Sequence, residues 1–216
     1  MGLLAAFLIS YLVGAIPTAV LAGKLLRGID IRQHGSKNAG ATNVWRVLGW
    51  RAGLGVLAID LCKGLAAAAL IPSLPFGPLP LDLANVSVLC GLCAVIGHVF
   101  PVYVGFRGGK GVATAAGMLL ATAPWPMACA AGVFLLTVLL SGFVSLGSML
   151  GAVCVPILIA VFGRYGVGSY PPLLLGLAGA LPLFILFTHR RNIVRLLRGT
   201  EPPFAGLPVW KRKGLR

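Results

Sequence analysis

Seven apolar runs, separated by short polar or proline-rich segments, constrain this sequence more than any other feature. The runs cover residues 3–22, 52–71, 84–104, 111–123, 126–142, 145–162 and 172–188. Hydrophobic residues make up 58% of the 216 residues and charged residues only 10%, a composition that a soluble domain of this length cannot bury. About 20 apolar residues form a helix that crosses a bilayer. The sequence therefore predicts an all-α integral membrane protein with about seven transmembrane helices, in one polytopic domain over residues 1–216.

The basic residues are distributed unequally between the two sides of this predicted domain. The loops near residues 72–80, 124–126 and 163–172 share one side and contain only Arg164. The opposite side receives six Lys and Arg residues in segment 23–51, two in 105–110 and eight after residue 188. By the positive-inside rule this side is cytoplasmic, so we expect the N-terminus outside and the C-terminus inside. The net charge of +14 follows from this topology, which makes the lipid bilayer a partner and argues against nucleic acid.

Three polar segments on the predicted cytoplasmic side contain most of the residues suited to chemistry. In the first, residues 35–46 (GSKNAGATNVWR), small residues permit close approach of a ligand. Hydroxyl, amide and cationic groups together suit a hydroxylated phosphate ester, although an interfacial turn that caps a short helix would also use them. The groups in question are Ser36, Lys37, Asn38, Thr42, Asn43 and Arg46.

The second segment, residues 100–114 (FPVYVGFRGGKGVAT), contains a glycine-rich loop with Lys110 at the start of the fourth apolar run. Glycines allow backbone N–H groups to turn toward an anion, and a helix N-terminus favours negative charge. The loop is not a Walker A motif, because its glycine spacing is one residue short and a glycine follows Lys110 where Ser or Thr would bind magnesium. A flexible basic loop is the alternative. The side chain of His98, just before this segment, either faces the polar site or packs against neighbouring helices.

The third segment, residues 189–201, places His189, Asn192 and Arg195 at three-residue intervals on a predicted helix. Glu201 follows, and we expect it to neutralise Arg195 or Arg198. Asp60 and Lys63, one turn apart inside the second apolar run, are expected to pair because isolated charges are costly in the membrane.

The absence of certain residue types limits the mechanism. The chain has only four acidic residues, Asp30, Asp60, Asp82 and Glu201, and they do not form a paired-carboxylate or metal-binding pattern. Cys90 and Cys93 form a CxxC within an apolar run, which we interpret as packing. We therefore expect neither a metal nor another cofactor.

The three segments, in this order and spacing, resemble the bacterial acyl-phosphate:glycerol-3-phosphate acyltransferase family over nearly the whole chain. The first family motif, GSxNxGxTNxxR, matches residues 35–46, the second, FPxxxxFKGGKGVAT, matches residues 100–114, and the third, HxxNxxRxxxGxE, matches residues 189–201. A DxxKG stretch at residues 60–64 and an SLGS stretch at residues 145–148 also agree. Arg107 stands where the family commonly has Lys, which keeps the charge but changes its geometry.

The resemblance implies an acyltransferase of the bacterial cytoplasmic (inner) membrane, which acts early in phospholipid synthesis. It would transfer a fatty acyl group from acyl phosphate to the 1-hydroxyl of glycerol 3-phosphate, giving lysophosphatidic acid and phosphate. A partner enzyme would supply the acyl phosphate. Residues expected to act in catalysis are Ser36, Arg46, Lys110, His189 and Asn192. Those expected to contact substrate are Lys37, Asn38, Thr42, Asn43, His98, Arg107, Gly108, Gly109, Gly111, Thr114, Ser145, Arg195 and Glu201.

Two points stay open at this level. The proton of the attacking hydroxyl passes either to a phosphate oxygen of the donor or to His189 or His98. A transporter or channel for organic phosphates is the alternative function, because cationic helix ends in a membrane cavity also suit anion passage. A transporter needs access from both faces, however, and the predicted outer loops contain a single basic residue.

Overall fold

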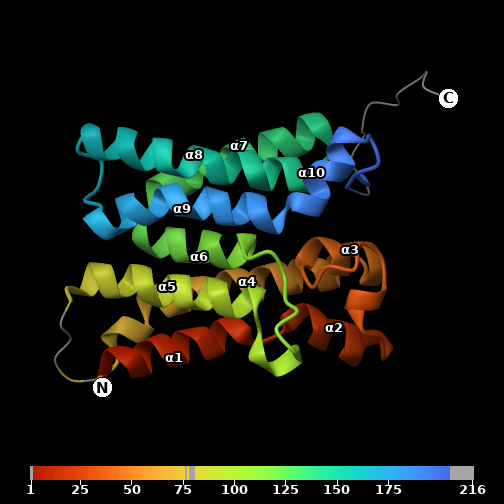
Figure 1. Cartoon of the computed structure of the whole chain (residues 1–216), viewed down its shortest axis with the longest axis horizontal. Helices are drawn as coiled ribbons and strands as arrows, with labels where there is room; N and C mark the ends of the chain where they lie inside the picture. Colours follow the sequence, from red (N-terminus) through yellow and green to blue (C-terminus); the bar gives the residue numbers. More distant parts are fainter. Residues whose placement is uncertain (1, 76, 78–80, 205–216) are drawn as a thin grey trace.

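The structure is a computed structural model of the chain, and it describes residues 2–75, 77 and 81–204. These residues fold into α-helices and short 3-10 helices (Figure 1). The helices are α1 (Gly2–Ala15), α2 (Thr18–Arg27), η1 (Ile31–Gln33), α3 (Ala41–Leu48), α4 (Trp50–Ala69), η2 (Ile71–Ser73), α5 (Leu83–Val99), η3 (Val102–Val104), α6 (Val112–Thr122), α7 (Pro124–Ser141), α8 (Val144–Arg164), α9 (Pro172–Thr188) and α10 (Arg190–Leu197).

The long helices lie roughly along one direction and form a bundle. Figure 1 shows α2, α3 and α10 at one end of this bundle, together with the loop between α5 and α6, while the N-terminus lies at the other end. Within the described residues, five helical segments are long and apolar enough to cross a membrane: Gly2–Arg27, Trp50–Ser73, Leu83–Val104, Pro124–Ser141 and Val144–Arg164. A sixth results if α9 and α10, bent by 62° relative to each other, count as one span. The predicted all-helical membrane architecture is confirmed at this level.

The short fourth apolar run, predicted at residues 111–123, is the helix α6. With 11 residues it extends about 16 Å at 1.5 Å per residue, which is half the thickness of the hydrocarbon core. The helix is packed inside the bundle, and Ala115, Met118 and Leu119 on it belong to the largest apolar core, together with Val155 and Ile159 of α8. Its length means that α6 does not cross a bilayer by itself.

The first apolar run, predicted as one helix over residues 3–22, is interrupted at Ile16–Pro17. Proline has no backbone N–H and disturbs the preceding turn, so the helical hydrogen bonding breaks between α1 and α2. At this break, the Nζ atom of Lys63 on α4 donates to the carbonyl oxygen of Ile16 at 2.9 Å, and the backbone N–H of Thr18 donates to the same oxygen at 3.0 Å. Lys63 also lies 2.8 Å from Asp60 Oδ1, which confirms the predicted pair. Thr18 Oγ1 donates to the same carboxylate.

Candidate active site

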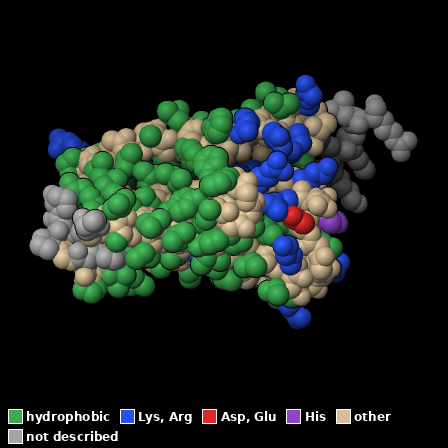
Figure 2. Space-filling model, turned by 60° about the horizontal axis from the view of Figure 1, so that its bottom comes forward, with side chains coloured by type: hydrophobic (Ala, Val, Ile, Leu, Met, Phe, Trp, Pro, Cys, Tyr) green, Lys and Arg blue, Asp and Glu red, His purple; other side chains and the backbone are tan. Residues whose placement is uncertain are grey.

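The three polar segments meet at one end of the bundle. In the view of Figure 2, Lys and Arg side chains gather at one end of the molecule, while its flank is mainly hydrophobic. Lys110 Nζ of the second segment donates to Asn192 Oδ1 of the third at 2.5 Å. Arg46 Nη2 of the first segment donates to the carbonyl oxygen of Pro202, beside the third, at 3.0 Å. The segments, distant in sequence, therefore form one contiguous polar region.

The first segment is folded around the side chain of Asn43. Asn43 is buried, and its Oδ1 accepts a hydrogen bond from the backbone N–H of Ser36 at 2.8 Å. A Cβ atom on Gly35 would collide with Asn43 Oδ1, and Gly35 has a φ of +58°, so the turn requires glycine. Asn43 Nδ2 lies 3.1, 3.0 and 3.0 Å from the carbonyl oxygens of Ile31, His34 and Asn38. The structure thus uses Asn43, expected to contact substrate, to hold the loop.

The remaining predicted residues of this segment stay reachable from solvent. Ser36, Asn38 and Thr42 are half-buried, and Lys37 is exposed. Lys37 has a φ of +60°, a conformation that non-glycine residues rarely adopt. Such strain is found most often at functional sites, so it agrees with a binding role for this loop.

Arg46 on α3 lies beneath the residues that follow the third motif. Its Nη2 also lies 3.4 Å from the carbonyl oxygen of Pro203, and the ring centroids of Trp45 and Phe204 are 4.9 Å apart. The backbone N–H of Phe204 donates to the carbonyl oxygen of Gly142 at 2.8 Å. Residues 202–204 therefore cover one side of Arg46. Sequence reasoning missed them, because backbone carbonyl and ring contacts leave no motif.

The glycine-rich loop is bound to the end of α5 by its own backbone. The N–H of Gly108 donates to the carbonyl oxygen of Val99 and that of Gly109 to the carbonyl oxygen of His98, both at 3.1 Å. These two groups, expected to turn toward an anion, are occupied within the protein. Gly111 is the residue before α6, whose first backbone N–H groups have no partner inside the helix. An anion at this loop would therefore meet the start of α6 and Lys110.

Glu201 connects the third segment to α8. The carboxylate is buried, and its Oε1 accepts hydrogen bonds from Asn192 Nδ2 at 2.6 Å and from Ser145 Oγ at 2.7 Å. Its Oε2 accepts from Arg195 Nε at 2.6 Å. Of the two arginines expected to neutralise Glu201, the structure selects Arg195. Because Asn192 also accepts from Lys110, the hydrogen bonds run without interruption from Lys110 to Ser145.

The charges of this network are set by burial and by each other. Burial lowers the pKa of Lys110 to about 8, although Glu201 opposes this effect, and the positive charges of Arg195 and Arg46 add to the lowering. Burial raises the pKa of Glu201, but hydrogen bonds from Ser145, Arg195 and Asn192 outweigh it, so the net pKa is lowered. Glu201 is thus ionised at neutral pH, and Lys110 is cationic with a proton that it loses in mildly alkaline solution.

His189 is buried at the bend between α9 and α10. Its Nδ1 lies 2.8 Å from the carbonyl oxygen of Ile185. A carbonyl only accepts hydrogen bonds, so Nδ1 must donate. In the neutral ring, Nε2 then has a free lone pair and is able to accept a proton or a hydrogen bond.

The other predicted residues lie around this network with different degrees of exposure. Arg107 is exposed, and its carbonyl oxygen lies 3.4 Å from Nη1 of Arg32. Thr114, in the first turn of α6, is buried. Sequence reasoning missed Arg32, which pairs with Asp30 at 2.8 Å and donates to the carbonyl oxygen of Val104 at 2.8 Å. The sequence signal for Arg32 was its spacing from Asp30, whose side chain accepts from the backbone N–H of Arg32.

Comparisons with known proteins identify the family. The family model described as glycerol-3-phosphate acyltransferase matches residues 4–199. The chain belongs to this family. A glycerol-3-phosphate acyltransferase of Chlorobium phaeobacteroides is 48% identical, with 92% of this chain and 95% of the relative covered. One of Chlorobaculum tepidum is 46% identical, with 92% and 94% covered.

Two solved structures are similar in fold over nearly the whole length. They are crystal structures of PlsY (YgiH), an integral membrane glycerol 3-phosphate acyltransferase, in a glycerol 3-phosphate form and in a lysophosphatidic acid form. Both are 35% identical and cover 95% of this chain and 96% of the solved one, with TM-scores of 0.82 and 0.80. Together with the apolar helices, this confirms the predicted family and the predicted localisation as a multi-pass inner-membrane protein.

Proposed function

We propose that the chain transfers a fatty acyl group from acyl phosphate to the 1-hydroxyl of glycerol 3-phosphate, producing lysophosphatidic acid and inorganic phosphate. The observation that supports this most directly is the hydrogen-bonded network of Lys110, Asn192 and Glu201, with Arg195 on the same carboxylate. Both substrates are anionic, so cations must offset their repulsion. The forms in which the PlsY structures are described, with glycerol 3-phosphate and with lysophosphatidic acid, support the acceptor and the product.

The residues at the site divide between the two substrates. We assign Ser36, Arg46, Lys110, His189 and Asn192 to glycerol 3-phosphate. The phosphate of the donor is assigned to the end of the glycine-rich loop, where the first N–H groups of α6 are unused by the helix. Since the N–H groups of Gly108 and Gly109 are bonded to α5, these glycines shape the loop rather than bind the anion.

The reaction needs positioning more than a strong base. The hydroxyl oxygen attacks the acyl carbon, an ester bond forms, and the bond between that carbon and the phosphate oxygen breaks. The hydroxyl proton passes to the departing phosphate, so atoms and charge balance without a further reactant. Holding the hydroxyl oxygen close to the acyl carbon accounts for most of the rate acceleration. His189 is the competing base, because its Nε2 has a free lone pair when the ring is neutral.

The orientation in the membrane follows from the charge distribution. We propose that the N-terminus lies outside and that the C-terminus and the three segments lie at the cytoplasmic face. Termini on opposite sides need an odd number of crossings, so the glycine-rich loop and α6 together count as one crossing in addition to the six longer segments. The acyl-phosphate-generating enzyme would then deliver its product from the cytoplasm, and lysophosphatidic acid would leave into the bilayer. A reporter that is active only in the cytoplasm should function at the C-terminus. Activity of an exported reporter there would contradict this orientation.

A donor assay tests the function. Purified protein in detergent receives glycerol 3-phosphate with either acyl phosphate or acyl-CoA, and the release of phosphate or thiol is measured. We expect phosphate release with acyl phosphate. Thiol release alone would show a thioester donor. No acylation with either donor, combined with glycerol 3-phosphate uptake into proteoliposomes, would favour the transporter.

The proton acceptor is tested with the same assay across pH. His189→Ala and His98→Ala are compared with the wild type. If His189→Ala abolishes turnover but retains substrate binding, and the wild-type rate follows an imidazole titration, His189 is the base and the donor phosphate is not.

A further inference from the structure

A buried ion pair lies behind the glycine-rich loop and has no part in the chemistry proposed above. Asp60 and Lys63 on α4 are 1% and 5% exposed. The ammonium group of Lys63 has three hydrogens and lies near three acceptors: Asp60 Oδ1 at 2.8 Å, the carbonyl oxygen of Ile16 at 2.9 Å and His98 Nδ1 at 3.3 Å. Each hydrogen therefore has one partner, and His98 is one of the three.

This arrangement determines the tautomer of His98. An ammonium group only donates, so Nδ1 must accept with its lone pair. Asp60 Oδ1 lies 3.6 Å from Nδ1, which is too far for a hydrogen bond that would place a proton there. The neutral ring of His98 therefore has its proton on Nε2.

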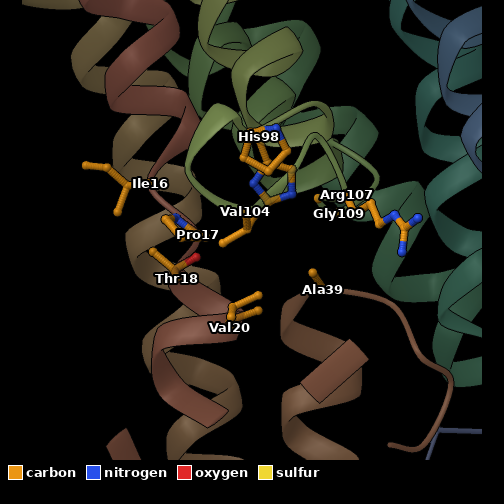
Figure 3. Close-up of a pocket in the computed structure, with 12 residues that line it drawn as sticks. Ile16, Pro17, Thr18, Val20, Ala39, His98, Val104, Arg107 and Gly109 are labelled. Carbon is orange, nitrogen blue, oxygen red and sulfur yellow. The ribbon is translucent and has the colours of Figure 1, made fainter. Parts of the chain in front are cut away.

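The Nε2 atom faces the junction of two motif segments. A Cβ atom on Gly109 would collide with His98 Nε2 and would lie 2.7 Å from the carbonyl oxygen of Ala39. His98, Gly109 and Ala39 line one small cavity, in which His98 lies at the glycine-rich loop and Ala39 opposite (Figure 3). The cavity measures about 10 Å³, close to the space that one water molecule needs. Because Nε2 and the Ala39 carbonyl oxygen both lie within 2.7 Å of that Cβ position, at most one water molecule fits between them.

His98 therefore lies between the two motif segments. Its backbone carbonyl accepts from the N–H of Gly109, the residue that directly precedes Lys110. Its ring donor faces Ala39, which lies in the first segment between Ser36 and Arg46. The separation of these two segments decides how far the groups on the first segment lie from Lys110.

We propose that His98 is a positioning residue, whose Nε2–H, oriented by Lys63 and Asp60, binds the carbonyl of Ala39 through one water molecule. This contact sets the distance between the first segment and Lys110. The inference rests on the proposed function, because the two segments hold substrates that must meet at bonding distance. It gives the buried pair a role beyond closing the break between α1 and α2.

Two substitutions of His98 separate this role from a merely structural one. Glutamine places an amide N–H near the position of Nε2, whereas asparagine places its amide near Nδ1, where it accepts from Lys63. If His98 positions the first segment, His98→Gln retains most of the wild-type kcat. His98→Asn then lowers kcat by about 100-fold, as expected for a misplacement of about 1 Å, with little change in either KM. If His98 only accepts the hydrogen bond from Lys63, His98→Asn should retain more activity than His98→Gln.

The experiment measures phosphate release by the full chain in detergent, with kcat and KM for acyl phosphate and for glycerol 3-phosphate. A melting temperature for each variant shows whether it is folded. The proposal is overturned if His98→Asn is as active as His98→Gln, or if neither variant differs from the wild type. Wild-type protein that releases no phosphate from acyl phosphate contradicts the proposed function instead.

Nitrogen NMR of histidine-labelled wild-type protein provides a test that does not depend on activity. His34 and His189 each have Nδ1 beside a backbone carbonyl, at 3.0 and 2.8 Å, so both should be protonated at Nδ1. His98 alone should show an unprotonated Nδ1 and a protonated Nε2, and this signal should vanish in His98→Gln. A protonated Nδ1 on His98 would overturn the proposal even if both variants failed to fold.

Discussion

Removing Arg195 should destabilise the protein, whereas removing Arg198 should not. The two arginines lie three residues apart near the end of α10, and each is a plausible partner of Glu201 from sequence alone. In the structure Arg195 Nε lies 2.6 Å from Glu201 Oε2, while Arg198 is exposed. Arg195→Gln and Arg198→Gln are therefore matched variants, since each removes one positive charge from the same helix end.

The size of the effect follows from burial. A hydrogen bond to a charged group contributes about 1.5–3 kcal/mol. The Glu201 side chain is 5% exposed but that of Arg195 is 33% exposed, so solvent screens part of the interaction. We expect Arg195→Gln to cost about 1–2 kcal/mol. That corresponds to a fall in melting temperature of about 2–8 °C, measured in detergent. Arg198→Gln should stay within about 0.5 kcal/mol of the wild type.

The cost of Arg195→Gln should also depend on pH. The pKa of Glu201 is lowered in the folded state, so its ionised form stabilises the fold fully above the pKa of an unfolded glutamate, about 4.3. This stabilisation is lost as pH falls through the lower pKa of the folded state. The difference between wild type and Arg195→Gln should therefore be constant near neutral pH and shrink in acid.

Two results would refute this reasoning. An equal loss of stability in both arginine variants would mean that net charge at the helix end matters and the specific contact does not. A difference that persists unchanged below the pKa of Glu201 would mean that Arg195 stabilises the fold through packing.

Three further predictions concern other parts of the site. The KM for glycerol 3-phosphate should rise as pH increases through about 8, because Lys110 loses its proton there. Lys110→Met should remove this pH dependence and raise KM at neutral pH. If KM of this variant still rises in alkaline solution, another group causes the rise. Asn43→Ala should lower the free energy of unfolding by about 2–4 kcal/mol, seen as a lower melting temperature, since it leaves the N–H of Ser36 and nearby carbonyls unpaired, whereas Thr42→Ala should not. Phe204→Ala should change the KM for glycerol 3-phosphate with little effect on stability, because residues 202–204 cover Arg46; equal KM values would show that this cover does not affect binding.

Membrane class and the protein family were largely predictable from sequence. The apolar runs are local features, and a bilayer imposes one length scale on all of them, so composition and run length predicted helices that cross it. The three motif segments were recognisable because each is contiguous in sequence. The network around Glu201, by contrast, needed coordinates to choose between Arg195 and Arg198, since both are compatible with the spacing.

Helix continuity was predicted less well than helix existence. The first apolar run has a proline at residue 17, and whether such a proline bends or breaks a helix depends on the groups packed around it. Here Lys63 on α4, 47 residues away in sequence, bonds to the carbonyl oxygen of Ile16 at the break. The fourth run reads as a crossing by its composition, yet α6 has only 11 residues and is packed inside the bundle.

The sequence by itself determined that this chain belongs in a membrane, which of its segments are polar, and that those segments suit phosphate. Only the tertiary structure decided which atoms of those segments are free. It bonded the N–H groups of Gly108 and Gly109 to α5, buried Asn43 inside its own loop, and joined Lys110 to Asn192, 82 residues away. The physical reason is that residue type specifies which hydrogen bonds a group is able to make, whereas the packing of distant helices specifies which of them it makes.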